Sequence, residues 1–314
     1  MPPRLSVVTS LYKGADYLTP FLENLAQQSL FEELELVLVH NAPQPEELLI
    51  LDTFRQNHPG KTQHIVVDEV ETLGASWNRG WQAAGGDYIA IWNVDDRRTP
   101  DSLERQLGWL EANPEAVVCY GDLYEVTEYG LEEGDFISTP AYSLGRFRRS
   151  FPQRGAFLVF RKGIVESLGY FDEQLQVGPD LDFAWRIAAR GMHMGRAGGV
   201  MGYFTNAEQG LSTRDGARRS AIERTTLQLR YGVFDKVRSE YLREAESYRL
   251  DAVQNFGEWV AVENILPSYK NYLTLRQPLR LFGWLRNALR NLFRRLGILR
   301  AIYALQERFI QREI

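Results

Sequence analysis

Residues 73–96 read LGASWNRGWQAAGGDYIAIWNVDD. This stretch predicts a helix over 75–84, a two-glycine stop and a buried strand over 88–92. Asp95 and Asp96 follow just past the carboxyl end of that strand, the edge where ligands bind in open α/β sheets. Because adjacent carboxylates disfavour joint ionisation, we expect a positive charge beside them. A divalent metal, which prefers hard oxygen ligands, would supply it.

An acidic helix entry explains the same two carboxylates. Thr99 can cap the helix that follows, Pro100 suits a first helical position, and acids are favoured near a helix N-terminus. The stretch alone leaves both interpretations open.

Strands and helices alternate ahead of this stretch. Short apolar or β-branched runs predict strands at 5–10, 35–40 and 63–68, and longer runs between them predict helices at 15–28 and 45–57. This alternation indicates βαβ units and a parallel sheet. Residues 1–98 are therefore expected to form the nucleotide-binding half of a doubly wound fold.

The chain beyond Asp96 predicts a second half over residues 99–214. Its expected elements are a helix at 99–113, strands at 116–120 and 123–127 joined as a hairpin through Gly121-Asp122, a long surface loop at 130–152, a strand at 155–160, and helices at 162–168 and 180–189. Strand signals vanish beyond Asp215, so residues 215–314 are expected to form a helical extension after a soft domain boundary.

The composition is that of a soluble globular protein. The 314 residues are 44% hydrophobic and 25% charged, which argues against wholesale disorder. The single cysteine, Cys119, excludes an internal disulfide and fits a reducing compartment. The sequence shows neither a signal-peptide pattern nor an apolar run of about 18 residues, so a cytoplasmic location is expected.

The basic charge is concentrated near the C-terminus. Residues 264–306 carry +8 in a chain whose net charge is −5. Apolar residues recur at spacings of three and four from Phe282 to Tyr303, which predicts a basic amphipathic helix over 276–303. Such a helix can attach peripherally to an anionic membrane surface on the cytoplasmic side. A helix packed on the core, or a homodimer seam, explains the pattern equally well, and no nucleic-acid partner is expected.

Five segments, in this order, resemble the family 2 glycosyltransferases with the GT-A fold, over roughly residues 5–212. They are 6–12 with Tyr17-Leu18; 36–41; 74–80 with 84–88; 93–96; and 155–162 through 168–172. The resemblance implies an α/β GT-A (Rossmann-like) fold, with a mostly parallel sheet flanked by helices and the helical C-terminal extension.

The resemblance implies a nucleoside diphosphate sugar lying across the ends of the first strands, beginning near Ser10. Tyr12 would stack on the base, as an exposed aromatic ring can. Asn41 stands where the family has an aspartate that reads the base edge, and an amide both accepts and donates. Gly74 and Asn78 match a family segment that helps hold the donor.

The segment Asn93-Val94-Asp95-Asp96 resembles the family's metal and diphosphate motif, with Asn93 in place of its first aspartate. By this resemblance Asp95 is the principal ligand of Mg²⁺ or Mn²⁺, and Asp96 lies beside the donor sugar. The family often brings a histidine to the metal from a later loop, but residues 203–212 contain none.

Residues 178–187 resemble the signature in which an acid pair opens a helix, and Asp180 aligns with the family's general base. That base takes a proton from an acceptor hydroxyl, so the resemblance implies an inverting glycosyltransferase. The expected acceptor is a saccharide or, if the C-terminal helix binds a membrane, a lipid-linked group, in polysaccharide or glycolipid assembly. Asp180 also suits a helix cap, and the two roles are compatible.

Four positions depart from the family pattern: Asn41, Trp77 in place of an arginine, Asn93, and Pro179 in place of a glutamate. They support an alternative hypothesis, a catalytically degenerate GT-A protein that binds nucleotide sugars or acts as a scaffold.

Overall fold

The computed structural model describes residues 2–143, 157–206, 210, 213, 217–233, 237–267 and 292. Residues 1–267 form one compact unit and residues 268–314 a second. The predicted boundary near residue 214 falls within this unit. The predicted amphipathic helix at 276–303 lies outside the described residues, apart from Leu292. Among the described residues, no helix combines the length and apolarity needed to cross a membrane.

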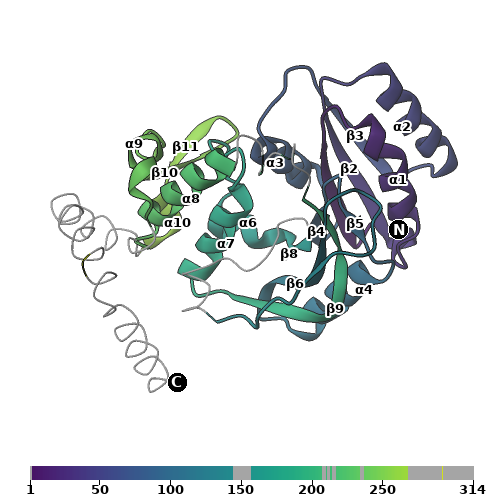
Figure 1. The fold of residues 1–314 in the computed structure, drawn as a ribbon. Helices are drawn as coiled ribbons and strands as arrows, with labels where there is room; N and C mark the ends of the chain where they lie inside the picture. Colours follow the sequence, from purple (N-terminus) through teal and green to yellow (C-terminus); the bar gives the residue numbers. More distant parts are fainter. Residues whose placement is uncertain are drawn as a thin grey trace. The chain divides into compact units, whose positions relative to one another are not determined.

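Four parallel strands form the first half of the sheet in the order β3-β2-β1-β4 (Figure 1). They are β1 (Leu5–Leu11), β2 (Leu34–Asn41), β3 (Thr62–Val67) and β4 (Tyr88–Ile91). β1, β2 and β4 are almost continuously buried because helices cover both of their faces.

Helices pack on the two faces of this half-sheet in different ways. One face carries α1 (Ala15–Ala26) and α2 (Pro45–Asn57), whose leucines and phenylalanines share a buried cluster with alternate residues of β1 and β2. The other face carries α3 (Leu73–Ala83), which approaches closely through a glycine. A Cβ on Gly80 would lie 2.5 Å from Val8 Cγ1 and 3.4 Å from Val39 Cγ2. The predicted βαβ half is therefore confirmed.

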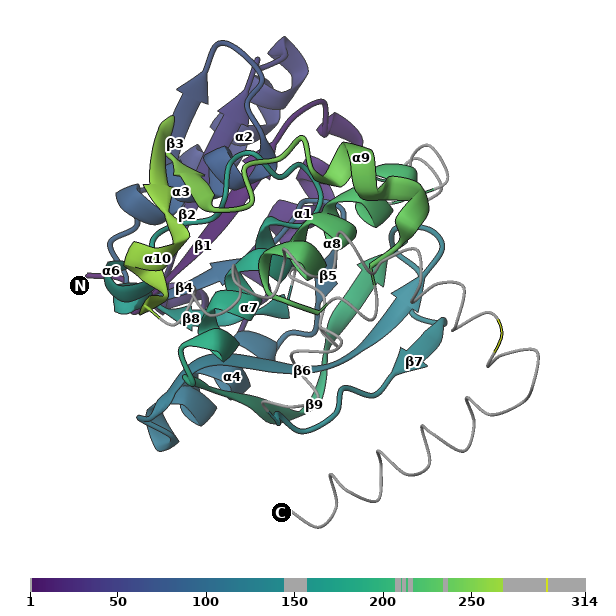
Figure 2. The same cartoon turned by 90° about the vertical axis from the view of Figure 1, so that its left-hand side faces the viewer.

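The second half extends the sheet with mixed strand directions (Figure 2). The added strands are β5 (Arg97–Arg98), β6 (Ala116–Val126), β7 (Asp135–Ile137), β8 (Val159–Arg161) and β9 (His193–Thr205). β6 and β9 are parallel, whereas β8 is antiparallel to both β4 and β6. Within the described residues the result is a nine-stranded sheet, and the predicted α/β class is confirmed.

Helices of the second half complete the core. α4 (Ser102–Ala112) joins the cluster of α1 and α2, and η3 (Lys162–Ile164) with α6 (Val165–Leu168) follows β8. α7 (Pro179–Ala189) packs toward α3 through an aromatic cluster of Trp81, Phe160, Phe171 and Phe183, whose ring centroids lie 4.8 to 6.3 Å apart.

The predicted hairpin at Gly121-Asp122 is wrong, because β6 runs through both residues. A Cβ on Gly121 would lie 2.5 Å from Met201 Cε, so the glycine permits close packing on β9. Asp122 is buried and accepts hydrogen bonds from Thr139 N at 2.8 Å and Arg196 Nε at 3.1 Å. The register with β9 shifts on both sides of Asp122, so a Gly-Asp pair that suggested a turn marks a β-bulge.

Strand β9 was not predicted, because its glycines interrupt the apolar pattern. Two of them are sites of close packing, since a Cβ on Gly195 would collide with the Trp109 ring and one on Gly202 with Arg97 O and the Phe157 ring. Glycine in a strand then indicates a neighbour at short distance rather than a loop.

In its described residues the extension is helical in part, as predicted, and it also contains a hairpin. The helices are α8 (Arg218–Arg230), η6 (Ser239–Tyr241), α9 (Leu242–Ala245) and α10 (Val262–Ile265). The prediction that strands are absent is wrong, because β10 (Ala252–Asn255) pairs with β11 (Glu258–Ala261). The connecting Phe256 and Gly257 both have positive φ, +51° and +78°, as a two-residue primed turn requires. Phe-Gly is not the usual signal for that turn.

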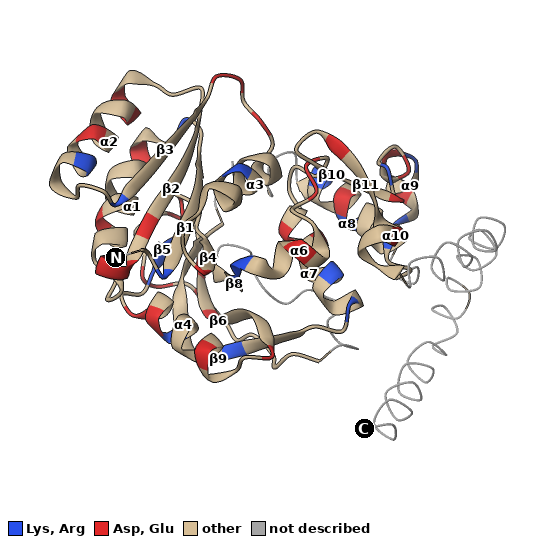
Figure 3. Cartoon of the chain, turned by 180° about the vertical axis from the view of Figure 1, so that it is seen from behind, with Lys and Arg blue, Asp and Glu red and all other residues tan. Residues whose placement is uncertain are grey.

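A buried ion network joins the extension to the second half. The Arg230 guanidinium on α8 donates to Asp172 Oδ2 at 2.8 Å and Asp182 Oδ1 at 2.7 Å, and all three side chains are fully buried. Arg186 Nε donates to the other Asp182 oxygen at 2.9 Å, and Tyr231 Oη donates to Oδ1 at 2.6 Å. Figure 3 shows acidic and basic positions interspersed where α6, α7 and α8 lie near β10. Burial alone would lower the pKa of Arg230, but Asp182 and Asp172 hold it well above its usual value.

We predict that Arg230→Met destabilises the protein by about 3–5 kcal/mol, because two buried carboxylates lose their counter-charge. The measurement is the urea unfolding midpoint of the full chain. Arg55→Met removes an exposed arginine 3.6 Å from Asp52 and should change stability by less than about 0.5 kcal/mol. A loss below about 1 kcal/mol for Arg230→Met would contradict the importance of this network.

Candidate functional site

Three of the predicted site regions lie at one edge of the sheet. β2 and β4 flank β1 in parallel, and Ser10 lies opposite Val39. Tyr12, Asn41 and residues 93–96 therefore follow neighbouring strand ends, at the carboxyl edge where open α/β sheets bind ligands.

Tyr12 presents its ring at this edge. Its side chain is 46% exposed, and Lys13 Nζ lies 5.3 Å from the ring centroid. The next residue, Lys13, has φ +49°, and Ala42 after β2 has φ +44°. Both loops thus hold non-glycine residues in the left-handed region, a form of strain that is concentrated at ligand sites. The ring is accessible for stacking.

Asn41 is buried and engaged on every side. Its Nδ2 donates to Ser76 Oγ at 3.0 Å and to Ser10 Oγ at 3.4 Å, while its Oδ1 accepts from Glu71 N at 3.1 Å. The amide therefore joins the end of β1, helix α3 and the segment before α3. A ligand contact to Asn41 would compete first with the long bond to Ser10.

Glu47 binds the backbone of the loops that follow β1 and β2, and the sequence did not predict this role. The buried carboxylate accepts from Gly14 N at 2.7 Å, Gln44 N at 2.9 Å and His40 Nε2 at 2.9 Å. Burial opposes its charge, but these hydrogen bonds prevail and lower the pKa of Glu47. The available signal was the capping box that opens α2, with Glu47 three residues after Gln44.

A cavity of about 490 Å³ lies between the N-terminal turns of α1 and α2. It is lined by Lys13, Ala15, Asp16, Gln44, Pro45, Glu46 and Glu47. Lys13 connects this cavity to Tyr12, so the space adjoins the edge described above.

Asp95 and Asp96 differ in how the protein holds them. Asp96 is 1% exposed, and its Oδ1 accepts from Thr205 N, at the end of β9, at 3.0 Å. Its Oδ2 lies 3.5 Å from Asn93 Nδ2. The Asp95 carboxylate receives no hydrogen bond from any other residue in the described part of the chain, so it is the carboxylate of the pair left for a ligand.

The charge of this pair is poorly compensated. Burial raises the pKa of Asp95, and burial together with repulsion by Asp95 raises the pKa of Asp96 well above its usual value. Arg98 lies nearby, but burial lowers its pKa to about 9, with Asp96 opposing that fall. A cation bound at Asp95 and Asp96 would supply the positive charge that these two buried carboxylates lack.

The residues fit a magnesium-type ion. Within the described ranges, no three or more His, Cys, Asp or Glu side chains are grouped so that they could hold a metal ion by themselves. Asp95, Asp96 and the Asn93 amide supply oxygens, the ligands that Mg²⁺ and Mn²⁺ prefer. Such ions often take only one or two carboxylates and complete their shell with phosphate oxygens and water.

Gly74 and Asn78 link α3 to the segment that leads into α7. A Cβ on Gly74 would lie 3.3 Å from Asp172 O and 3.4 Å from Pro179 Cβ. Asn78 is fully buried; its Nδ2 donates to Phe171 O at 2.9 Å and its Oδ1 accepts from Phe171 N at 2.8 Å. These two residues place the start of α7 against α3.

Trp77 packs inside the protein, where the family has a polar arginine. Its ring is 3% exposed and meets the Phe171 ring edge-on at 5.1 Å. Its Nε1 has no hydrogen-bond partner among the described residues. Trp77 therefore gives no phosphate contact.

Asp180 stands in the first turn of α7, and Gly178 is the N-cap. Glu223 of α8 supports this turn, because its carboxylate accepts from the backbone N–H groups of Gln176, Val177 and Gly178 at 2.8 to 2.9 Å. The sequence does not indicate this role of Glu223, since an acid in a helix gives no sign of a partner more than 40 residues away.

Tyr129 is a further residue near the acid pair that the sequence did not indicate. Its hydroxyl is buried and has no hydrogen-bond partner within the described ranges. Burial raises its pKa to about 12; Arg97 opposes this rise, and Asp96 and Asp95 add to it. The ring meets Tyr17 edge-on at 5.5 Å, which fixes the β6–β7 loop near α1.

Comparisons with known proteins agree with this fold. The model of Glycosyl transferase family 2 matches residues 6–168. The amylovoran biosynthesis glycosyltransferase AmsE of Erwinia amylovora is 29% identical over 192 residues, 59% of this chain and 70% of AmsE. The structure of S. aureus TarS 1–349 with UDP-GlcNAc aligns with a TM-score of 0.58 at 18% identity, over 78% of this chain and 73% of that one. The mannosyltransferase PcManGT of Pyrobaculum calidifontis with GDP-Man and Mn²⁺ aligns with a TM-score of 0.54 at 18% identity, over 92% and 81%.

We predict that Asp95→Asn raises the melting temperature of the metal-free protein by a few degrees near neutral pH, because it removes a repulsive buried charge. A carboxyl whose folded pKa is raised is most favourable to folding below its unfolded pKa and loses that contribution as the pH rises. The difference in melting temperature between Asp95→Asn and the wild type should therefore shrink as the pH falls toward about 4.

The measurement is a series of thermal melts across this pH range, with the exposed Asp87→Asn as the matched control. Equal effects of the two variants, or a decrease in melting temperature for Asp95→Asn, would show that the pair is not under electrostatic strain.

Proposed function

The chain belongs to Glycosyl transferase family 2, whose model matches more than half of it, and we propose that it transfers a sugar from a nucleoside diphosphate sugar to an acceptor hydroxyl with inversion. The observation that carries this proposal is the under-compensated pair Asp95 and Asp96 at the same sheet edge as Tyr12 and Asn41. A diphosphate with its metal fits such an edge.

The proposed donor lies from Tyr12 toward Asp95. The exposed Tyr12 ring would stack on the base, and Ser10 and Asn41 would lie at its polar edge. Two structural neighbours hold UDP-GlcNAc and GDP-Man, which supports a nucleotide-sugar donor without selecting the base or sugar. Gly74 and Asn78 contribute by holding α3 and α7 together.

We assign the metal, Mg²⁺ or Mn²⁺, to Asp95 as the principal ligand. When bound, such an ion neutralises charge that develops on the departing diphosphate. Thr205 N and Asn93 orient the Asp96 carboxylate, so Asp96 can accept a hydrogen bond from a hydroxyl of the donor sugar. The neighbour with GDP-Man also holds Mn²⁺, which supports metal use.

Asp180 would act as the general base. Its carboxylate would accept the proton of the acceptor hydroxyl as that oxygen attacks the anomeric carbon from the side opposite the diphosphate. Glu223 holds the preceding backbone, and Pro179 packs near Gly74, so the first turn of α7 has a defined position. Proton transfer by a positioned base typically contributes about 10²–10⁴-fold to the rate.

We propose a saccharide or lipid-linked acceptor in polysaccharide or glycolipid assembly. The relative AmsE is named for amylovoran biosynthesis, and this name supports a role in polysaccharide assembly. The basic helix that the sequence predicts at 276–303 would bring the site to an anionic membrane surface if the acceptor is lipid-linked.

A thermal-shift screen of nucleoside diphosphate sugars, with and without Mn²⁺, tests donor and metal together. We expect at least one donor to raise the melting temperature in a metal-dependent way, because ligands that bind only the native state stabilise it. Asp95→Ala should remove the metal-dependent part of this rise in melting temperature. Absence of any shift with wild-type protein would contradict the proposed donor site.

Asp180→Asn separates the enzyme from a degenerate binding module. We expect this variant to lose transfer by about 10²-fold or more while its donor affinity stays nearly unchanged, because the amide cannot take the proton. Donor affinity and the rate of transfer to an acceptor that the wild type uses are both measured. Asp135→Asn, a substitution of an exposed residue, serves as the control. Donor binding without turnover in the wild type would favour the binding module.

A further inference from the structure

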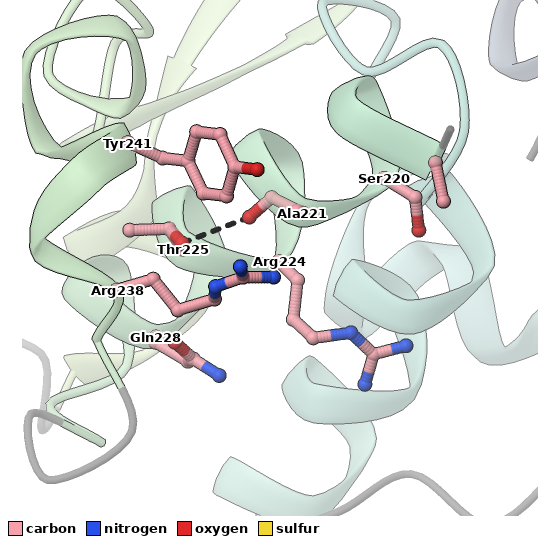
Figure 4. Close-up of a pocket in the computed structure, with 8 residues that line it drawn as sticks. Ser220, Ala221, Arg224, Thr225, Gln228, Arg238 and Tyr241 are labelled. Carbon is pink, nitrogen blue, oxygen red and sulfur yellow. Dashed lines mark hydrogen bonds between the residues drawn. The ribbon is translucent and has the colours of Figure 1, made fainter. Parts of the chain in front are cut away.

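Helix α8 has two faces with different tasks. One face carries Glu223, Leu227 and Arg230, which are buried against the segment before α7 and the ion network. The other face carries Ser220, Arg224, Thr225 and Gln228, and lines a separate pocket (Figure 4). The pocket is thus lined by a face of α8 that neighbours the face whose contacts position Asp180.

The pocket has a volume of about 310 Å³, the size of a small-molecule site at the lower end of the usual range. Its described lining residues are Ala217, Ser220, Ala221, Arg224, Thr225, Gln228, Arg238 and Tyr241. They include two arginines, an amide and hydroxyls, and no carboxylate belongs to this described lining. The pocket is therefore polar and positively charged.

Gln228 is the buried polar group of this pocket. Its side chain is 7% exposed, and its Oε1 has no hydrogen-bond partner among the described residues. A buried acceptor without a partner is unfavourable by about 1–3 kcal/mol. Thr225 does not relieve it, because the Thr225 hydroxyl donates to Ala221 O at 2.8 Å. A ligand hydroxyl would satisfy Gln228.

Arg224 and Arg238 supply the charge. Arg224 is exposed and makes no hydrogen bond or ion pair within the described part of the chain; in Figure 4 its guanidinium points away from Tyr241. Arg238 reaches across from the other wall, with its guanidinium 4.7 Å from the Tyr241 ring centroid. Its Nε donates to Glu240 Oε1 at 2.8 Å and its Nη2 pairs with the same oxygen at 2.8 Å, so a ligand would meet the remaining N–H groups of a guanidinium that already has one carboxylate partner.

We propose that this pocket binds a phosphate ester that carries hydroxyl groups, such as a sugar phosphate or a glycerophosphate. The phosphate lies between Arg224 and Arg238, because guanidinium groups match phosphate oxygens in charge and geometry. A hydroxyl of the same ligand donates to Gln228 Oε1. This site does not depend on the proposed transfer reaction or on a metal.

The test uses the full chain in metal-free buffer, so that diphosphate binding at Asp95 does not interfere. Glucose 6-phosphate, inorganic phosphate and glucose are titrated separately by calorimetry. Vesicles of phosphatidylglycerol and of phosphatidylcholine form the lipid arm, because the same phosphate chemistry occurs in a lipid headgroup. The variants are Arg224→Gln with Arg238→Gln, and Gln228→Leu; the exposed Arg190→Gln is the control.

We expect glucose 6-phosphate to bind more tightly than inorganic phosphate, and glucose not to bind. The double arginine variant should weaken binding at least about tenfold, Gln228→Leu should remove the advantage over inorganic phosphate, and the control should match the wild type. Binding only to phosphatidylglycerol vesicles, with the same dependence on both arginines, would identify a lipid headgroup as the source. No binding in either arm, or binding that both arginines leave unchanged, would overturn the proposal.

Discussion

The buried guanidinium of Arg230, held between Asp172 and Asp182, connects segments that are far apart in the chain. A charge in this environment is tolerated only when its partners surround it, and Arg230 also donates to the carbonyls of Arg249 and Ala252. The arginine therefore ties the end of α8 and the start of β10 to α7. Because of these bonds, the part of the extension up to residue 267 belongs to the same compact unit as the sheet.

The position of Asp180 follows from this arrangement. Helix α8, anchored by Arg230, carries Glu223 to the backbone before α7, and α3 meets the same turn through Gly74 and Asn78. The sequence predicts that Asn78 helps to hold a donor, but in the structure its side chain bonds to the protein itself. Its amide is fully occupied by the backbone of Phe171 and by the Glu173 carboxylate, so its contribution is to the geometry of α7.

At the carboxyl edge of the sheet, in contrast, buried negative charge lacks a positive partner. Around Asp172 and Asp182 the negative charges have buried partners, whereas Asp95 and Asp96 keep a charge that the described residues do not balance. Local disagreement with the rules of stability is expected at functional sites, because a ligand supplies what the folded chain lacks. Lys13 and Ala42, two of the non-glycine residues with positive φ, lie at this same edge.

The sequence by itself determined the first half of the fold and the candidate edge. The apolar runs of β1, β2 and β4 and the α2 boundaries at Pro45 and Asn57 follow from local periodicity and caps, which any short window contains. Only the tertiary structure decided that Gly121-Asp122 is a bulge, that the glycine-rich β9 is a strand, and that Glu47 and Glu223 support the site. The physical reason is that a glycine can permit either a turn or a close contact, and a buried charge is defined by its partner; both are settled by residues distant in the chain.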